Sequence, residues 1–248
     1  MHISLAPEIL FHIGAFPVTN TILVSTAITL GLTTIAFAIS SRLSWKPNAL
    51  QNAAEALCEA IVNFIDSITE NRKQSLQFFP LVVTIFIFVA LSNLVEIVPG
   101  LGTIGFLEKI HGKEVIVPFL RSSSADLNAT LAIALFAVGG IQFFGIFALG
   151  LIPYGKKFFF PPWEKPYVVG TFIGLLELVA EGAKIVSFSF RLFGNIFAGE
   201  VLLGVMLFLL PVLAPLPFLG LEIFVGIIQA VVFSMLTLVF LKVATAHH

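Results

Sequence analysis

Long uninterrupted apolar runs are the feature that most limits what this chain can fold into. A helix needs about 20 apolar residues to cross a hydrocarbon core about 30 Å thick. Runs of this length fit helices better than the short alternating strands of a barrel, because a helix satisfies its own backbone groups in lipid. We therefore predict an all-α polytopic membrane protein. Five crossings are expected, near residues 18–39, 76–98, 127–152, 168–210 and 218–243.

Composition agrees with a membrane protein and excludes several other functions. Of the 248 residues, 58% are hydrophobic and 11% are charged, whereas soluble domains carry about 25% charged residues. The 13 basic and 14 acidic residues leave no basic excess, so we expect no nucleic-acid partner. Cys58 is the single cysteine, and no Cys or His spacing fits a metal or haem site, so we expect neither a metal nor a cofactor. Met1 to Asn20 contains no Lys or Arg, so we expect no cleaved signal peptide.

An amphipathic helix is predicted near residues 48–70, between the first and second runs. Apolar side chains recur there every three or four positions, opposite polar ones. We expect this helix to lie on the cytoplasmic interface or to pack on a partner; a surface helix without further function is the alternative. Because the sequence shows neither an internal repeat nor a second domain, residues 1–248 are expected to form a single transmembrane domain.

The distribution of basic residues predicts the orientation, because Lys and Arg are enriched in cytoplasmic loops. If the ends of the predicted crossings that carry most of the Lys and Arg residues share the cytoplasmic side, the N-terminus lies outside and the C-terminus lies in the cytoplasm. Lys109, Lys113 and Arg121 then belong to an outer loop. The basic residues placed on the cytoplasmic side are Arg42, Lys46, Arg72, Lys73, Lys156, Lys157, Lys165 and Lys242.

The run at 168–210 is about twice as long as one crossing requires, since a helix of this length would extend about 64 Å. No proline interrupts the run, and dividing it into two crossings would move Lys242 to the outside. We therefore expect one long, strongly tilted helix at 168–210, followed by the last crossing at 218–243.

Polar residues inside the long run are the strongest functional signal, because each ionised group costs about 2.5–3.5 kcal/mol at membrane depth on insertion scales. They are Glu177, Glu181, Lys184, Arg191, Asn195 and Glu200. At 100° per residue, all but Glu181 and Glu200 fall within an arc of about 40°. Glu181 lies about 40° further round this helix, and Glu200 points to the opposite side.

Polar residues of other runs extend this set. Glu222 and Gln229 are seven residues apart and share one face of the last run, and Asp126 and Asn128 lie at the outer start of the third run. Arg191 then separates an outer set of acids from an inner set. Carboxylates in a wet cavity can exchange protons, whereas arginine stays protonated and can block a proton relay but not carry it.

The alternative is that these charges only pair and hold the helices together, with Glu177 or Glu181 binding Lys184. This alternative fits Arg191 poorly, because the acids on its own face lie seven or more residues away, beyond the reach of an intrahelical pair. We expect the partner of Arg191 to lie on another chain.

The segment from Ser189 to Glu200, SFRLFGNIFAGE, resembles the signature of subunit a of F-type ATP synthases. SADLNAT at 124–130 and IQA at 228–230 extend the resemblance over nearly the whole chain. The resemblance implies a non-catalytic stator subunit whose last two helices, both long and strongly tilted, pack against a ring of c subunits. The signature and the distribution of basic residues suit a bacterial plasma membrane, and a plastid relative is the alternative. The resemblance also implies that b-type peripheral stalk subunits and other ATP synthase subunits are partners, and that ATP is made elsewhere in the complex.

The resemblance further implies roles for individual residues. Arg191 would meet the ring carboxylate, and Glu177 would line the half-channel open to the cytoplasm. The family varies at the positions of Glu181 and Lys184. The half-channel open to the outside would be lined by Asn195, Glu200, Glu222 and Gln229.

We therefore expect proton translocation coupled to ring rotation, although the sequence leaves the choice between proton and sodium open. A secondary transporter with a midplane site built on Arg191 and the acids is the alternative. A membrane scaffold whose charges only pair is a third interpretation. The lack of an internal repeat weighs against the transporter.

Overall fold

The structure is a computed structural model that describes residues 7–41, 47–97, 105–110, 113–118, 121–158, 167–209 and 215–246. Its helices are α1 (Asn20–Ser40), α2 (Ala49–Thr69), α3 (Arg72–Ile97), α4 (Leu127–Leu149), α5 (Leu151–Phe158), α6 (Tyr167–Leu209) and α7 (Pro215–Thr245). A short 3-10 helix, η2 (Ser123–Ala125), precedes α4. Arg42, Lys46 and Lys165, which the predicted orientation uses, lie outside the described residues.

Among the described residues, five helices, α1, α3, α4, α6 and α7, are long and apolar enough to cross a membrane. They confirm the prediction of an all-α polytopic protein with five crossings. The run at 168–210 forms one helix of 43 residues, as expected. The run at 127–152 is divided, because Gly150 adopts a φ of +89°, a conformation that glycine tolerates and that ends α4. Ile152 therefore belongs to α5.

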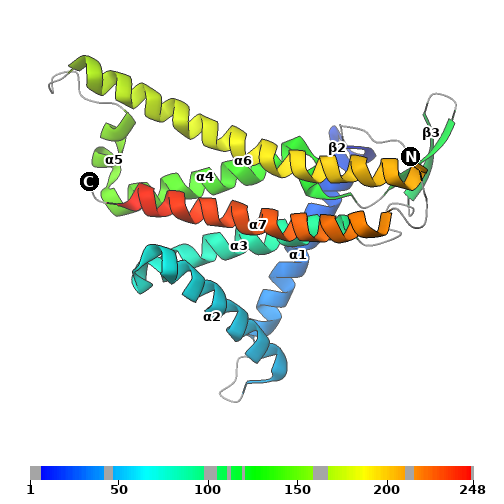
Figure 1. The fold of residues 1–248 in the computed structure, drawn as a ribbon, viewed down its shortest axis with the longest axis horizontal. Coiled ribbons are helices and arrows are strands. Elements are labelled where there is room, and N and C mark those ends of the chain that lie inside the picture. Colours follow the sequence, from blue (N-terminus) through cyan, green and yellow to red (C-terminus); the bar gives the residue numbers. More distant parts are fainter. Residues whose placement is uncertain are drawn as a thin grey trace.

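Four helices, α3, α4, α6 and α7, run along the length of the molecule, whereas α1 and α2 leave it at a steep angle (Figure 1). Two clusters of buried apolar residues hold this bundle together. Val89, Phe188 and Phe233 join α3, α6 and α7 in the first cluster. Ile65 and Leu238 join α2 to α7 in the second. The site residues of α6 and α7 are therefore carried by packed helices.

Two β-hairpins, which the sequence analysis did not predict, lie at one end of the bundle (Figure 1). β1 (Ile9–Ile13) pairs with β2 (Phe16–Thr19), and β3 (Gly105–Ile110) pairs with β4 (Lys113–Pro118), both antiparallel. The second hairpin lies within the predicted outer loop that contains Lys109 and Lys113. We call this end, where α6 ends and α7 begins, the hairpin end. The opposite end, where α5 lies and α6 begins, is the α5 end.

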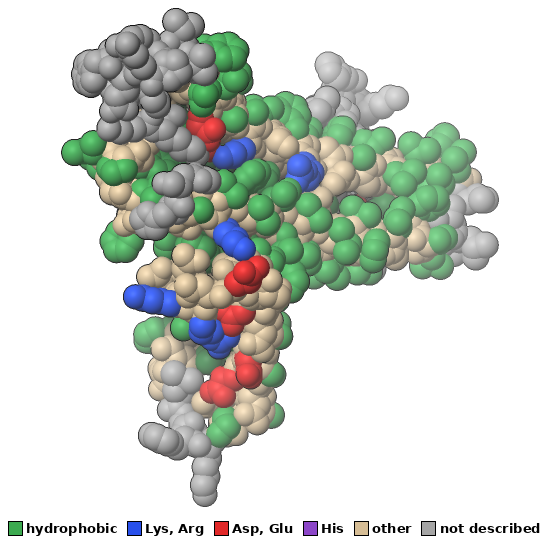
Figure 2. All heavy atoms as spheres, turned by 60° about the vertical axis from the view of Figure 1, so that its left-hand side comes forward, with side chains coloured by type: hydrophobic (Ala, Val, Ile, Leu, Met, Phe, Trp, Pro, Cys, Tyr) green, Lys and Arg blue, Asp and Glu red, His purple; other side chains and the backbone are tan. Residues whose placement is uncertain are grey.

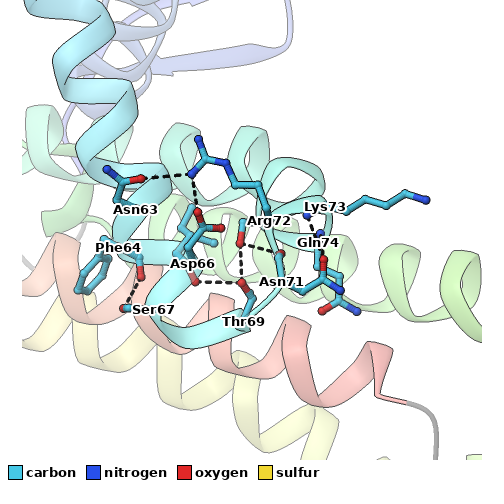
Figure 3. Close-up of polar contacts among 11 residues, drawn as sticks. Asn63, Phe64, Asp66, Ser67, Thr69, Asn71, Arg72, Lys73 and Gln74 are labelled. Carbon is cyan, nitrogen blue, oxygen red and sulfur yellow. Dashed lines mark hydrogen bonds and ion pairs between the residues drawn. The ribbon is translucent and has the colours of Figure 1, made fainter.

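The predicted amphipathic helix at 48–70 is present as α2, and polar contacts fix its last turns to α3 (Figure 3). Arg72 forms an ion pair with Asp66 and donates a hydrogen bond to Asn63 at 3.2 Å. Hydrogen bonds from Ser75 and Arg72 lower the pKa of Asp66. Lys242 of α7 donates to the carbonyl oxygen of Ile68 at 2.6 Å. We call α2 and the first turns of α3 the α2–α3 limb. Charged side chains gather over this limb, whereas hydrophobic side chains cover most of the bundle (Figure 2).

Candidate functional site

The hairpin end brings together the two acids Glu200 and Glu222, from α6 and α7. Glu222 is only 6% exposed, and a Cβ atom placed on Gly199 would lie 2.7 Å from its Oε1 atom. Neither carboxylate oxygen of Glu222 has a hydrogen-bond partner among the described residues. Glu200 accepts a hydrogen bond from Arg121 at 2.8 Å, in an ion pair. A paired and an unpaired carboxylate therefore lie side by side.

Two amides link the same helices between this acid pair and Arg191. Asn195 of α6 donates through Nδ2 to Oε1 of Gln229 on α7, at 2.8 Å. Gln229 is 4% exposed, and its Nε2 atom has no partner among the described residues. Asn93 of α3 donates to the carbonyl oxygen of Gly226 at 2.9 Å. Buried polar atoms without protein partners are usually satisfied by ordered water.

Arg191 lies near the middle of α6 and is half-buried. Its Nη2 atom donates to the hydroxyl of Ser187, one turn earlier on the same helix, at 3.3 Å. Within the described ranges, no carboxylate lies within ion-pair distance of its guanidinium group. The described part of this chain therefore supplies Arg191 with a hydroxyl contact and no counter-charge.

The α5 end holds the second set of charged residues. Glu181 and Lys184 form an ion pair at 2.7 Å. The alternative predicted from the sequence, in which Glu177 or Glu181 binds Lys184, therefore holds for Glu181. Tyr154 of α5 is 4% exposed, and its hydroxyl donates to Gln142 of α4 at 2.5 Å. Burial, and then the nearby charges of Glu181 and Glu177, raise the pKa of Tyr154 to about 12. The phenol is therefore a neutral hydrogen-bond donor at physiological pH.

Asp126 and Asn128 lie at the start of α4 and make contacts that hold helices in place. One carboxylate oxygen of Asp126 accepts from the backbone N–H of Asn128 at 2.9 Å and caps α4. The other accepts from the hydroxyl of Thr21 on α1, also at 2.9 Å. The Asn128 side chain is exposed. A part for either residue in ion movement stays a prediction.

Two polar residues of the hairpin end, Arg121 and Asn93, were not predicted as site residues from the sequence. Arg121 was expected in an outer loop but is 6% exposed. Both residues had a local signal. Arg121 directly precedes three serines at the start of an apolar run, and Asn93 follows Ser92 inside another. The hydroxyl of Ser122 donates to the carbonyl oxygen of Ser92 at 2.9 Å, so these two polar segments meet.

The fold and the site define a class of protein: an all-helical polytopic membrane protein whose longest helix carries an arginine between two charged clusters. Residues 20–242 match the family described as ATP synthase A chain. The chain belongs to this family of ATP synthase subunit a proteins, which are subunits of the membrane sector. Among the described residues, no group of three His, Cys, Asp or Glu side chains could hold a metal ion.

Named relatives agree with this assignment. ATP synthase subunit a of Moorella thermoacetica is 30% identical over 235 residues, which cover 95% of this chain and 94% of the relative. ATP synthase subunit a of Campylobacter jejuni is 33% identical over 199 residues, which cover 80% of this chain and 78% of the relative. ATP synthase subunit a 2 of Pelobacter propionicus is 29% identical over 235 residues, with 94% and 90% covered.

Proposed function

We propose that this chain is the non-catalytic stator subunit through which protons reach and leave the carboxylates of a ring of c subunits. Two half-channels, offset from one another, would couple this movement to ring rotation and to ATP synthesis elsewhere in the complex. The observation that carries the proposal is the position of Arg191, which lacks a described counter-charge and lies between the acids of the two ends.

The hairpin end would supply the outer half-channel. Glu200 is nine residues beyond Arg191, or about 13 Å along the helix axis. Asn195 and Gln229 lie between the acid pair and Arg191, and the unpartnered buried polar atoms of Glu222 and Gln229 favour water there. A carboxyl group in a wet cavity can take up and release a proton, so a proton could pass from Glu222 toward the ring beside Arg191.

The α5 end would supply the half-channel to the cytoplasm. Glu181 and Glu177 lie about 15 and 21 Å before Arg191 along the helix axis. Lys184 balances Glu181 in their ion pair. Glu177 is half-buried and is the acid that we assign to proton release. The chain itself would carry out no chemistry beyond this proton transfer.

Arg191 would meet each ring carboxylate as it passes and would block a direct leak between the half-channels. Arginine does not lose its proton at physiological pH, so it can neutralise an acid but cannot relay a proton. Val186 and Phe190 are more than half exposed on α6, and a Cβ atom on Gly194 would have open space around it. Small and exposed apolar residues of this kind allow another helix to approach closely.

The positive-inside rule supports an orientation with the hairpin end outside and the C-terminus in the cytoplasm of a bacterial cell. The 43-residue α6 exceeds one crossing about twofold, which supports a strong tilt. The mostly exposed α2 would lie at the cytoplasmic surface and contact b-type stalk subunits. On this basis the five crossings form one transmembrane unit.

ATP-driven acidification of inverted membrane vesicles that carry Arg191→Ala tests the proposal. Co-purification of the c ring shows whether the complex assembles. We expect normal assembly with pumping lost. Normal pumping by the assembled variant would contradict the mechanism, and a wild-type chain that co-purifies with no ring would favour a secondary transporter.

A further inference from the structure

Arg121 is a buried cation at the hairpin end that the proposed function does not yet use. Its side chain is 6% exposed, that of Glu200 is 20% exposed, and the two form an ion pair at 2.8 Å. Removing one partner of such a pair leaves a buried charge without compensation. Because arginine stays protonated, Arg121 is a permanent positive charge beside Glu200.

The second acid of this end has a different environment. Glu222 lies against Gly199, next to Glu200 in the chain, and interacts electrostatically with Glu200. Its carboxylate oxygens have no hydrogen-bond partner among the described residues. Asp126, the acid at the start of α4, has both oxygens engaged by Thr21 and the α4 backbone. Among the described residues, Arg121 from the loop before η2, Glu200 from α6 and Glu222 from α7 are therefore three charged groups that interact with one another at this end.

We propose that Arg121 is a positioning residue that gives the two acids different roles, a division that we call the division between Glu200 and Glu222. It holds Glu200 in an ion pair, and it leaves Glu222 as the group that exchanges the translocated proton. In each cycle, one proton from the outer water would bind the Glu222 carboxylate and then leave for the ring carboxylate, while Glu200 would gain and lose none. This inference rests on the proposed function.

The division predicts how the pH dependence responds to substitution. Arg121→Gln leaves two neighbouring carboxylates without their cation, and repulsion between like charges makes such a pair hold a proton up to a higher pH. The rate of ATP synthesis in proteoliposomes, measured against the pH on the hairpin side at a fixed membrane potential, should therefore shift. We expect its half-maximal point to move by about one pH unit or more toward alkaline pH.

Charge-matched variants distinguish positioning from packing. Arg121→Lys keeps the cation and should keep the wild-type profile. Removing both charges in Arg121→Gln with Glu200→Gln should return the profile toward the wild type. Arg72→Gln removes the cation of an exposed ion pair on the α2–α3 limb and should leave the profile unchanged.

An unshifted profile in assembled Arg121→Gln, or a shift that Glu200→Gln does not reverse, would overturn the inference. If Arg121→Gln alone does not assemble, the double variant decides: a wild-type profile supports the division, and a shifted profile contradicts it. Failure of the proposed function looks different, because Arg191→Ala would then pump normally whatever the Arg121 variants do.

Discussion

Asn195 donates a hydrogen bond to Gln229 across 2.8 Å and so joins α6 to α7 about one turn beyond Arg191. The two amides come from helices whose sequences alone do not show this contact. The bond orients the side chains that lie between the acids of the hairpin end and Arg191. The bond connects two helices at the deepest part of the proposed half-channel. We therefore expect substitutions of Asn195 and Gln229 to have effects that are not additive.

We predict that Asn195→Leu and Gln229→Leu each slow ATP-driven acidification and that the double variant is little slower than the slower single variant. Residues in direct contact typically show coupling energies of about 0.5–3 kcal/mol. Initial acidification rates of the four chains, normalised to c-ring content, measure the coupling. Thr33→Val, which removes an exposed hydrogen bond on α1, is the control. Strictly additive effects of Asn195→Leu and Gln229→Leu would argue against a functional pair.

Gly199 permits the close approach of Glu222 to α6. An added Cβ atom would lie 2.7 Å from Oε1 and 3.4 Å from Cδ of Glu222, so Gly199→Ala should displace this carboxylate. We expect proton transport to fall by about tenfold, equivalent to 1.4 kcal/mol, in complexes that still assemble. Gly220→Ala, at the same end of the bundle with open space around the added atom, should have little effect. Equal losses in both variants would show that the Glu222 contact is not the cause.

The α2–α3 limb should lose stability in acid through Asp66. Hydrogen bonds from Ser75 and Arg72 lower its pKa below the ordinary 3.8, so its ionised form stabilises the fold above that pH. The contribution is lost as the pH falls through the lowered folded-state pKa. Thermal unfolding of the purified complex between pH 3 and 6 should therefore show a deficit for Asp66→Asn that becomes smaller toward the acid end.

Glu59→Gln is the control for this acid effect, because Glu59 lies exposed on the same helix and no hydrogen bond or ion pair joins it to another described residue. It should behave as the wild type at each pH. A deficit for Asp66→Asn that stays constant from pH 6 to pH 3 would contradict the role of its charge.

The Tyr154 ring at the α5 end packs in the space left by the missing side chain of Gly145. A Cβ atom added there would lie 2.5 Å from Cε2 and 2.9 Å from Cζ of the phenol ring, which cannot flex away as a chain end can. Overpacking of this kind costs about 1–3 kcal/mol, so Gly145→Ala should lower the melting temperature of the complex. Gly139→Ala, on the same helix with no atom within 4 Å of the added carbon, should leave it unchanged. Unchanged melting in both variants would mean that α5 does not depend on this contact.

The helices could be predicted from the sequence because the length of an apolar run is a local property. The uninterrupted run at 168–210 predicts α6 in full, and the spacing of Glu177, Lys184 and Arg191 already places these residues on one face. Gly150, where the third run divides, was also visible, but its positive φ depends on the conformation that the chain adopts there.

Contacts between distant segments could not be predicted in this way. Arg121 and Glu200 are 79 residues apart, and Asn93 and Gly226 are 133 residues apart. From the sequence, Arg121 in particular is predicted to be a cation in a loop, whereas in the structure it is buried against Glu200. The pairing of Glu181 with Lys184, by contrast, spans one helical turn, so it could be predicted from their spacing as an alternative.

Water access from opposite sides tests the central claim most directly. In a Cys58→Ser background, which removes the single, exposed cysteine, Gln229→Cys and Glu177→Cys each introduce one thiol. A small membrane-impermeant methanethiosulfonate reagent is applied to right-side-out and to inverted vesicles of the assembled complex. Two half-channels separated at Arg191 predict that the Gln229→Cys variant is labelled only in right-side-out vesicles and the Glu177→Cys variant only in inverted ones. Labelling of both variants from the same side, or of either variant from both sides, would contradict the account.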